Sequence, residues 1–347
     1  MKLYLSKVYN RGPAPCITIN NKIKNLIDIN KCKDSNKLAN YVLTEFYIDR
    51  RFSQQKIADL FDVQHDTIRR WLDRLNIPVR SQGDSVSLAI TKYHKNLFSG
   101  NLVEKAYLLG LRCGDLSAQK HGRNIRIDVS STHPDMLRLF EDVFSAYGKI
   151  GIYPKFDKKP LITRFHSYQW KIYCDVDKSF EFILKKCDRI PRWIKEDEKL
   201  FYSFLSGYFD AEGCLNISYN KSNNSSLLWT IHSTDKHILK DIYDFLLKRG
   251  FNVNMKLAKE ADGIEYNKDY WSITVCMKIQ VLKLLKNMKL KHMEKIIKHN
   301  LALELINTSW KGADSKIREL RKSIKNGVRK CVESAKKEYV KRHPSLQ

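Results

Sequence analysis

The sequence predicts an α+β fold in which two copies of an αββαββα unit follow a small all-α domain. Three observations lead to this prediction. The stretches 106–116 and 200–213 both have the spacing of a helix with an apolar face, and both lead into an acid. Similar segments follow the two stretches in the same order, which indicates an internal duplication. Apolar residues at helical spacing within 36–80 predict the all-α domain.

The composition indicates a basic chain with ample material for a hydrophobic core. The 347 residues include 63 Lys and Arg against 38 Asp and Glu, a net charge of +25, and 43% are hydrophobic. So large a positive excess favours nucleic acid as a partner over a membrane surface. No apolar run is long enough to span a bilayer. The eight cysteines lack zinc-type spacing, so we expect reduced thiols, an intracellular protein and no structural zinc.

Residues 1–35 show no clear periodicity and are expected to be an irregular lead-in that leaves room for a short strand pair. Within 36–80, Ser53 is suited to begin a helix, and a further helix follows the short turn at 61–63. This pattern resembles a helix-turn-helix, and the recognition helix would carry exposed DNA-contacting residues. Those residues are His65, Thr67, Arg69 and Arg70. The alternative is a three-helix bundle that serves protein contacts.

The two duplicated helices are expected to pack closely through small residues. Gly207 and Ala211 lie one turn apart on one side of the second helix, and Gly110 and Gly114 take these places in the first. Without bulk at these positions, another backbone can approach. Gly213 follows the second helix, and we expect it to form a left-handed cap.

Domain boundaries follow from the duplication. We expect a linker at 81–100, the first copy at 101–196, the second at 197–307 and a basic helical extension at 308–347. The extension is interpreted equally well as a solvated surface helix or as a phosphate clamp.

Alternating apolar and polar residues predict antiparallel strands in each copy, with one sheet face packed on helices and the other free. Side chains on the free face are candidates to contact base edges or phosphates of a duplex. The candidates are Arg126, Asp128, Lys155, Lys171, Asn216, Ser218, Asn220, Lys256 and Ser272.

The stretch Phe204-Leu-Ser-Gly-Tyr-Phe-Asp-Ala-Glu-Gly213 resembles the motif of the LAGLIDADG homing endonucleases in their single-chain, two-repeat form. The resemblance covers roughly residues 102–306. The first copy, Ala106-Tyr-Leu-Leu-Gly-Leu-Arg-Cys-Gly-Asp-Leu116, departs from the pattern, because Leu116 stands where the family usually has glycine. The resemblance implies that the motif helices pack at a pseudo-twofold axis and that the sheets of a monomer form a saddle on double-stranded DNA.

The resemblance also implies a chemistry. Asp115 and Glu212 would each ligate Mg²⁺ (or Mn²⁺), and together they would make a double-strand break by phosphodiester hydrolysis. Carboxylates are suitable ligands for such hard cations. The family places a basic residue near the scissile phosphate, which implies Lys291 in the second copy and Lys195 in the first, with Arg192 as a rival.

Two other functions remain open on the same scaffold. One is a DNA-binding transcriptional regulator that has lost cleavage, which Leu116 and the helix-turn-helix keep in view. The other is an intron RNA maturase. Two acids at matching positions favour the nuclease over the regulator, the maturase shares the fold, and fold alone does not decide activity.

Overall fold

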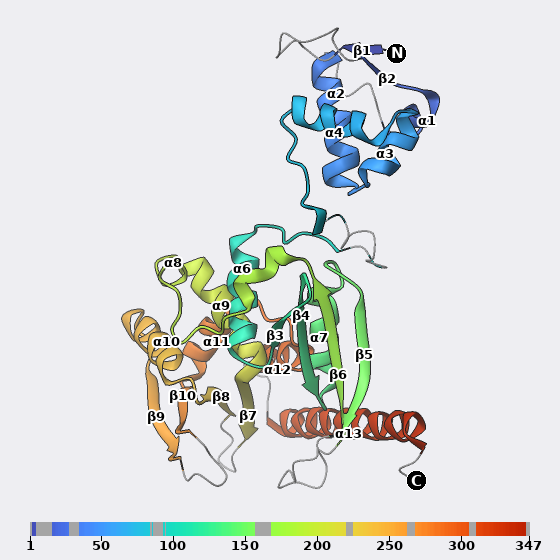
Figure 1. The fold of residues 1–347 in the computed structure, drawn as a ribbon. Helices are drawn as coiled ribbons and strands as arrows, with labels where there is room; N and C mark the ends of the chain where they lie inside the picture. The colour runs from blue at the N-terminus through green and yellow to red at the C-terminus, as the bar shows by residue number, and fades with distance from the viewer. Residues whose placement is uncertain are drawn as a thin grey trace. The chain divides into compact units, whose positions relative to one another are not determined.

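The computed structural model describes residues 2–4, 16–27, 35–83, 85, 93, 95–156, 168–219, 225–261, 268–304 and 310–344. The chain divides into two compact units, Met1–Lys92 and Tyr93–Gln347 (Figure 1). Among the described helices, none is long and apolar enough to cross a membrane. Asn220, one of the expected base-contacting residues, lies outside the described residues.

The N-terminal unit is a small helical bundle with a short strand pair. Its elements are β1 (Lys2–Tyr4), β2 (Cys16–Thr18), α1 (Asn21–Lys24), α2 (Ser35–Thr44), a π-helical turn (Glu45–Asp49), α3 (Gln54–Phe61) and α4 (His65–Arg74). The Ser53 hydroxyl accepts a hydrogen bond from the backbone N–H of Lys56, which begins α3. Asp62 ends α3 with a φ of 57°, a left-handed residue that turns the chain toward α4.

The core of this unit draws on residues well before the helices. Phe61 and Trp71 pack edge to face, with ring centroids 5.6 Å apart. Ile19, Ile23 and Ile27 are buried in the same cluster. The stretch that we expected to be an irregular lead-in therefore contributes to the hydrophobic core of the bundle.

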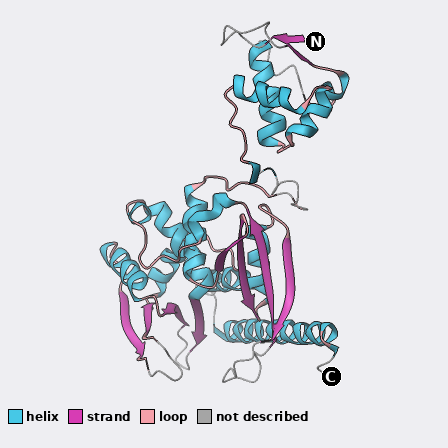
Figure 2. Cartoon of the chain, in the orientation of Figure 1, coloured by secondary structure: helices cyan, strands magenta, loops and turns pink. Residues whose placement is uncertain are grey.

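The C-terminal unit contains two repeats of one αββαββα order, which confirms the predicted fold class (Figure 2). The first repeat consists of α6 (Leu102–Cys113), β3 (Ser117–His121), β4 (Asn124–Ser131), α7 (Pro134–Phe144), β5 (Ile150–Phe156), β6 (Tyr168–Val176) and a 3-10 helix (Lys178–Ile183). The second consists of α9 (Glu198–Glu212), β7 (Gly213–Tyr219), β8 (Ser225–Ser233), α10 (Lys236–Lys248), β9 (Val253–Lys259), β10 (Tyr270–Val275) and α11 (Lys278–Asn287). The short α8 (Arg192–Lys195) joins them.

Both sheets are antiparallel and have equivalent strand orders, β3-β4-β6-β5 and β7-β8-β10-β9. Their central strands pair in matching registers, with Val129 opposite Ile172 in one sheet and Ile231 opposite Ile273 in the other. All four of these side chains are buried against the helices. The period-two pattern therefore places one face of each sheet in a core.

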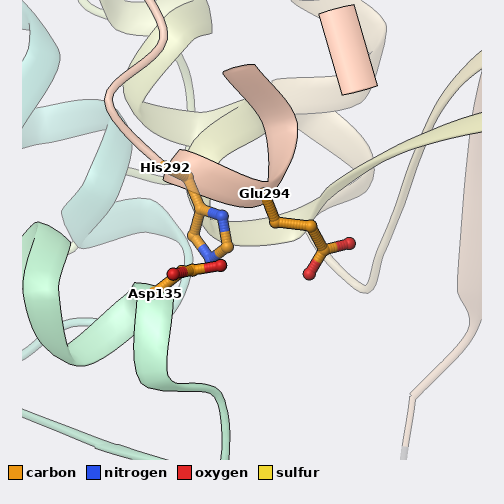
Figure 3. A group of neighbouring side chains, drawn as sticks. All are labelled: Asp135, His292 and Glu294. Atoms are coloured by element: carbon orange, nitrogen blue, oxygen red, sulfur yellow. The ribbon is translucent and has the colours of Figure 1, made fainter. Parts of the chain in front are cut away.

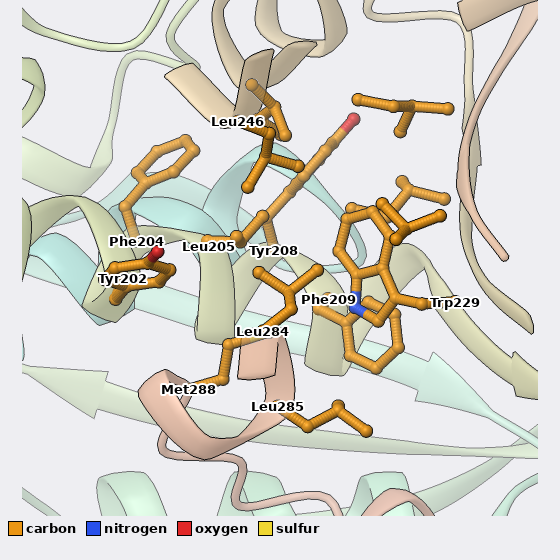
Figure 4. Close-up of a cluster of buried hydrophobic side chains, with 14 of the residues drawn as sticks. Tyr202, Phe204, Leu205, Tyr208, Phe209, Trp229, Leu246, Leu284, Leu285 and Met288 are labelled. Atoms are coloured by element: carbon orange, nitrogen blue, oxygen red, sulfur yellow. The ribbon is translucent and has the colours of Figure 1, made fainter. Parts of the chain in front are cut away.

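The second repeat holds the larger core, which forms around α9 (Figure 4). Phe209 of α9 stacks on Trp229 of β8, with ring centroids 5.1 Å apart. Tyr208 and Leu205 are fully buried in the same cluster. Because large side chains cover α9 on this side, its small residues are left for the side that faces α6.

Two further helices, α12 (Met293–Glu304) and α13 (Trp310–Arg342), follow the second repeat. The Arg321 guanidinium of α13 donates to the backbone carbonyl of Ile217 in β7. Farther along α13, the ring of Tyr339 contacts the rings of Phe156 and Tyr168, at the ends of β5 and β6. The basic extension thus packs against both repeats (Figure 1).

Candidate active site

The two motif helices, α6 and α9, cross with their backbones in contact. A Cβ added at Gly110 would lie 2.1 Å from the carbonyl oxygen of Phe204, and one added at Gly207 would lie 2.1 Å from that of Tyr107. The two contacts are reciprocal, as expected for helices related by a pseudo-twofold axis. No side chain fits at either position without separating the helices.

The C-terminal ends of the same helices converge. A Cβ at Gly114 would lie 2.3 Å from the Cβ of Ala211 and 3.1 Å from the Cγ of Glu212. Asp115 follows Gly114 directly, so the two acids end side by side. Asp115 is exposed to solvent, whereas Glu212 is half-buried.

The end of α9 differs from the expected left-handed cap. Gly213 has a φ of −77° and a ψ of 150°, an extended conformation that leads straight into β7. Glycine is required here because a Cβ would lie 2.0 Å from the Phe209 ring. Close packing, and not helix capping, therefore explains this residue.

The surroundings of the two carboxyls disfavour their charged forms. Burial and the negative charge of Asp115 raise the pKa of Glu212 to about 7. The pKa of Asp115 is also raised, because surrounding protein atoms displace water, although Lys295, His133 and Lys186 oppose this. Because these surroundings disfavour the ionised form of both acids, a bound cation would stabilise the two carboxylates.

Lys295, near the start of α12, lies beneath the two acids. Its buried ammonium donates to the backbone carbonyls of Phe209 and of Asp210, the latter at 2.7 Å. Both carbonyls belong to the last turn of α9, and that of Phe209 also accepts a hydrogen bond from the backbone N–H of Gly213. Burial lowers the pKa of Lys295 to about 8, while the charges of Asp210 and Asp115 oppose that shift.

Sequence reasoning missed Lys295. Nothing in the spacing of residues 293–304 distinguishes this lysine from the exposed cations around it. Lys186 was also missed. It forms an ion pair with Asp235 at 3.0 Å, and its charge opposes the rise in the pKa of Glu212.

The two lysines implied by the resemblance differ in their surroundings. Lys195 forms an ion pair with Asp241 of α10, at 3.3 Å. Lys291 is exposed, and its ammonium lies 4.5 Å from the ring centroid of Tyr107. Arg192, the rival of Lys195, is exposed and pairs with Glu196. Of these cations, Lys291 is therefore the one held against a motif helix.

A buried carboxyl joins the motif helices beside the site. Tyr107 of α6 donates its hydroxyl proton to Asp210 of α9, at 2.7 Å, and the backbone N–H of Lys291 donates to the same oxygen at 2.7 Å. Burial raises the pKa of Asp210. This group connects α6, α9 and the segment that leads into α12, so it positions the helix ends.

The sheet residues expected on the free faces divide into two groups. Lys155, Asn216, Ser218 and Lys256 are exposed, and Arg126 and Lys171 are half-buried. Asp128 and Ser272, expected to be exposed, are instead buried, at 5% and 1% exposure. Both lie on central strands, where longer neighbours cover short side chains. Lys171 pairs with Asp128 at 3.0 Å.

In the N-terminal unit, one face of α4 is polar. His65, Arg69 and Arg70 are exposed and Thr67 is half-buried. Ile68, Trp71 and Leu72 are buried in the bundle. The exposed side chains share a helix face, and their DNA contact stays a prediction.

Comparison with known proteins identifies part of the chain. Residues 202–289 match the LAGLIDADG-like domain family. A protein of Methanocaldococcus jannaschii, described as uncharacterized, is 28% identical over 200 residues, which cover 55% of this chain and 70% of the relative.

Solved structures are similar at lower identity. The homing endonuclease I-WcaI, bound to its DNA recognition sequence, aligns with 61% of this chain and 89% of its own, at 16% identity and a TM-score of 0.40. The meganuclease I-SmaMI, bound to uncleaveable DNA, aligns with 63% of this chain and 97% of its own, at 11% identity and a TM-score of 0.36. The family match therefore spans the second repeat from within α9 to just beyond α11.

Proposed function

We propose that the C-terminal unit is a site-specific endonuclease that hydrolyses both strands of double-stranded DNA with a divalent cation. The observation that carries this proposal is the pair Asp115 and Glu212 at the converging ends of two helices in backbone contact. The LAGLIDADG-like domain and the net charge of +25 support it. A polyanionic duplex is the partner that this charge favours.

The donor set of the acid pair fits Mg²⁺ or Mn²⁺. Both carboxylates have a raised pKa because of burial, and the charge of Asp115 adds to the rise at Glu212, so they are hard oxygen ligands in a place where negative charge is unfavourable. When bound, the cation would neutralise the scissile phosphate and lower the pKa of its water. The chain itself brings both acids together through Gly114 and Ala211, whose small size lets the helix ends approach closely.

The three lysines considered for the site have different roles. Lys295 holds the last turn of α9 and supplies fixed positive charge beneath both acids. Lys291 lies exposed on the Tyr107 ring and is free to meet a phosphate. Lys195 is engaged with Asp241, so we assign it a structural part. Positive charge fixed before the reaction is an efficient way to stabilise a phosphoryl transition state.

The free faces of the sheets would contact the duplex. Lys155 and Lys256 are exposed at equivalent outer strands of the two sheets, whereas Arg126 and Lys171, on a central pair of strands, are engaged with Asp175 and Asp128. Cations distributed over both sheets suit phosphate contact on either side of the acids. Ser218 and Asn216 on β7 add neutral hydrogen-bonding groups for base edges.

The test is selection of cleaved sites from a randomised duplex library with Mg²⁺ or Mn²⁺. We expect a narrow set of sites, cut on both strands. Glu212→Gln and Asp115→Asn should abolish double-strand cleavage and leave binding intact, because neither change alters the sheets. Glu196→Gln, a change in an exposed acid outside the site, is the matched control. Full double-strand cutting by Glu212→Gln would refute the assignment.

A second function, a DNA-binding regulator without cleavage, is favoured by the N-terminal bundle and its exposed Arg69 and Arg70. The same library separates the two, because a regulator would enrich bound sites and never cut them. Under either function, Arg69→Ala with Arg70→Ala should shorten the protected footprint and reduce the salt dependence of binding. An unchanged footprint and salt slope would show that α4 serves another partner.

A further inference from the structure

A second group of metal-ligand side chains lies where the two repeats meet. Asp135 is in the first turn of α7, in the first repeat, whereas His292 and Glu294 are at the start of α12, after the second. One ligand atom from each residue lies within 4.8 Å of the other two. Figure 3 shows the His292 ring directed at the Asp135 carboxylate, with the Glu294 carboxylate to one side.

His292 is the residue that points to a ligand. Its side chain is 4% exposed, and its Nδ1 has no hydrogen-bond partner in the part of the chain that the structure describes. A buried polar atom without a partner is rare, because it has lost water without replacement.

The two carboxylates are only partly neutralised by protein cations. Glu294 pairs with Lys298 through one oxygen, at 2.6 Å, and its other oxygen lies 3.6 Å from His133. The Asp135 carboxylate lies 3.6 Å from Arg138, whose side chain is largely exposed. Both 3.6 Å distances are too long for a hydrogen bond. Each acid therefore keeps one oxygen without a hydrogen bond to any described residue, to which a cation could bind.

We propose that Asp135, His292 and Glu294 bind a divalent first-row transition metal such as Zn²⁺, in a structural site separate from the Asp115 and Glu212 pair. One imidazole with two carboxylates suits Zn²⁺, whereas Mg²⁺ prefers oxygen ligands alone. The site would tie α7 to the start of α12, the helix that carries Lys295 to the end of α9. Binding there would stabilise the junction between the repeats.

The test is equilibrium dialysis of the full chain against Zn²⁺ with excess Mg²⁺. The background is Asp115→Asn with Glu212→Gln, so that the proposed cleavage site does not contribute to the count. This protein should retain a single Zn²⁺ ion and melt at a higher temperature with Zn²⁺ than with a chelator. His292→Gln in the same background should lose both the ion and the Zn²⁺-dependent rise. His299→Gln, a half-buried histidine farther along α12, should keep both.

A second variant guards against misfolding. If His292→Gln lacks the far-ultraviolet circular dichroism of its parent, Asp135→Asn replaces it, since Asp135 is half-buried and its loss leaves no cavity. Asp135→Asn should weaken Zn²⁺ binding about tenfold or more. Zn²⁺ retained equally by the parent and Asp135→Asn, or not bound by the parent, would overturn the proposal. Neither result bears on DNA cleavage, which is measured separately.

Discussion

The C-terminal ends of α6 and α9 occupy equivalent places in the two repeats but are held by different means. At the end of α6, Arg112 of the same helix donates to the backbone carbonyls of Leu116, at 2.7 Å, and Ile183, at 3.0 Å. At the end of α9, the carbonyls accept from Lys295, which arrives from α12. The first repeat thus completes its own helix end, and the second depends on a segment that follows it.

This difference teaches that the duplication kept the backbone contact and not the electrostatics. Gly110 and Gly207 each lie against the backbone of the other motif helix, in reciprocal contacts. In contrast, burial and neighbouring acids raise the pKa of Glu212 to about 7, while at Asp115 burial raises the pKa and nearby cations oppose the rise. A single buried ammonium, Lys295, interacts with the charge of Asp115 and of Glu212. The two acids are therefore expected to differ in how strongly they depend on it.

The largest expected effect tests where the repeats are alike. Gly207→Ala and Gly110→Ala should each lower the free energy of unfolding by about 3 kcal/mol, because a Cβ would lie 2.1 Å from a backbone oxygen of the other helix. The measurement is urea unfolding of the full chain. Gly327→Ala in α13 is the control, since its Cβ would meet only Pro134, at 3.7 Å, and should be neutral or stabilising. Equal midpoints for Gly207→Ala and Gly327→Ala would contradict the backbone contact.

The second prediction tests where the helix ends differ. Lys295→Met should cost about 2 kcal/mol, since the last carbonyls of α9 lose their buried donor. It should also slow cleavage strongly, because positive charge beneath both acids disappears. Arg112→Met should have a comparable effect on stability with a smaller effect on the cleavage rate. The measurement is the single-turnover cleavage rate of Lys295→Met and of Arg112→Met at saturating Mg²⁺, under conditions in which both variants are equally folded. Equal losses of rate would show that the two helix ends act alike.

The smallest effect concerns an ion pair found in the first sheet. Arg126 donates two hydrogen bonds to Asp175, each 2.8 Å, and at the equivalent places the second sheet has Leu228 and Cys276. Burial raises the pKa of Asp175, but the hydrogen bonds and charge of Arg126 outweigh it, so the pKa is lowered. A lowered carboxyl pKa stabilises the fold above the unfolded-state pKa, and this stabilisation is lost as pH falls through the folded-state pKa.

Asp175→Asn should therefore cost about 0.5–1 kcal/mol at pH 6. The difference from wild type should shrink as the pH is lowered below about 4, the ordinary pKa of an aspartate. Urea midpoints of both proteins across this range measure it. A difference that stays constant with pH would show that the pair does not control the titration of Asp175.

Much of the architecture followed from the sequence because it rests on local pattern. The αββαββα order, the antiparallel sheets and the two acid-terminated helices follow from apolar periodicity and from the duplication. The small residues Gly110 and Gly207 stand where their spacing placed them, at the helix crossing. Leu116, which departs from the family pattern, is buried in the core of the first sheet.

The tertiary structure alone decided which distant charges meet at the helix ends. Lys295 lies 83 positions after Glu212 in the chain, and the helix α12 that carries it gives no sign of facing α9. Asp128 and Ser272 are buried because neighbouring strands cover them, a matter of sheet order. The sequence lacks zinc-type spacing, yet Asp135, His292 and Glu294 converge, since folding brings α7 against α12. Periodicity fixes which face of an element is buried, and only packing fixes what that face meets.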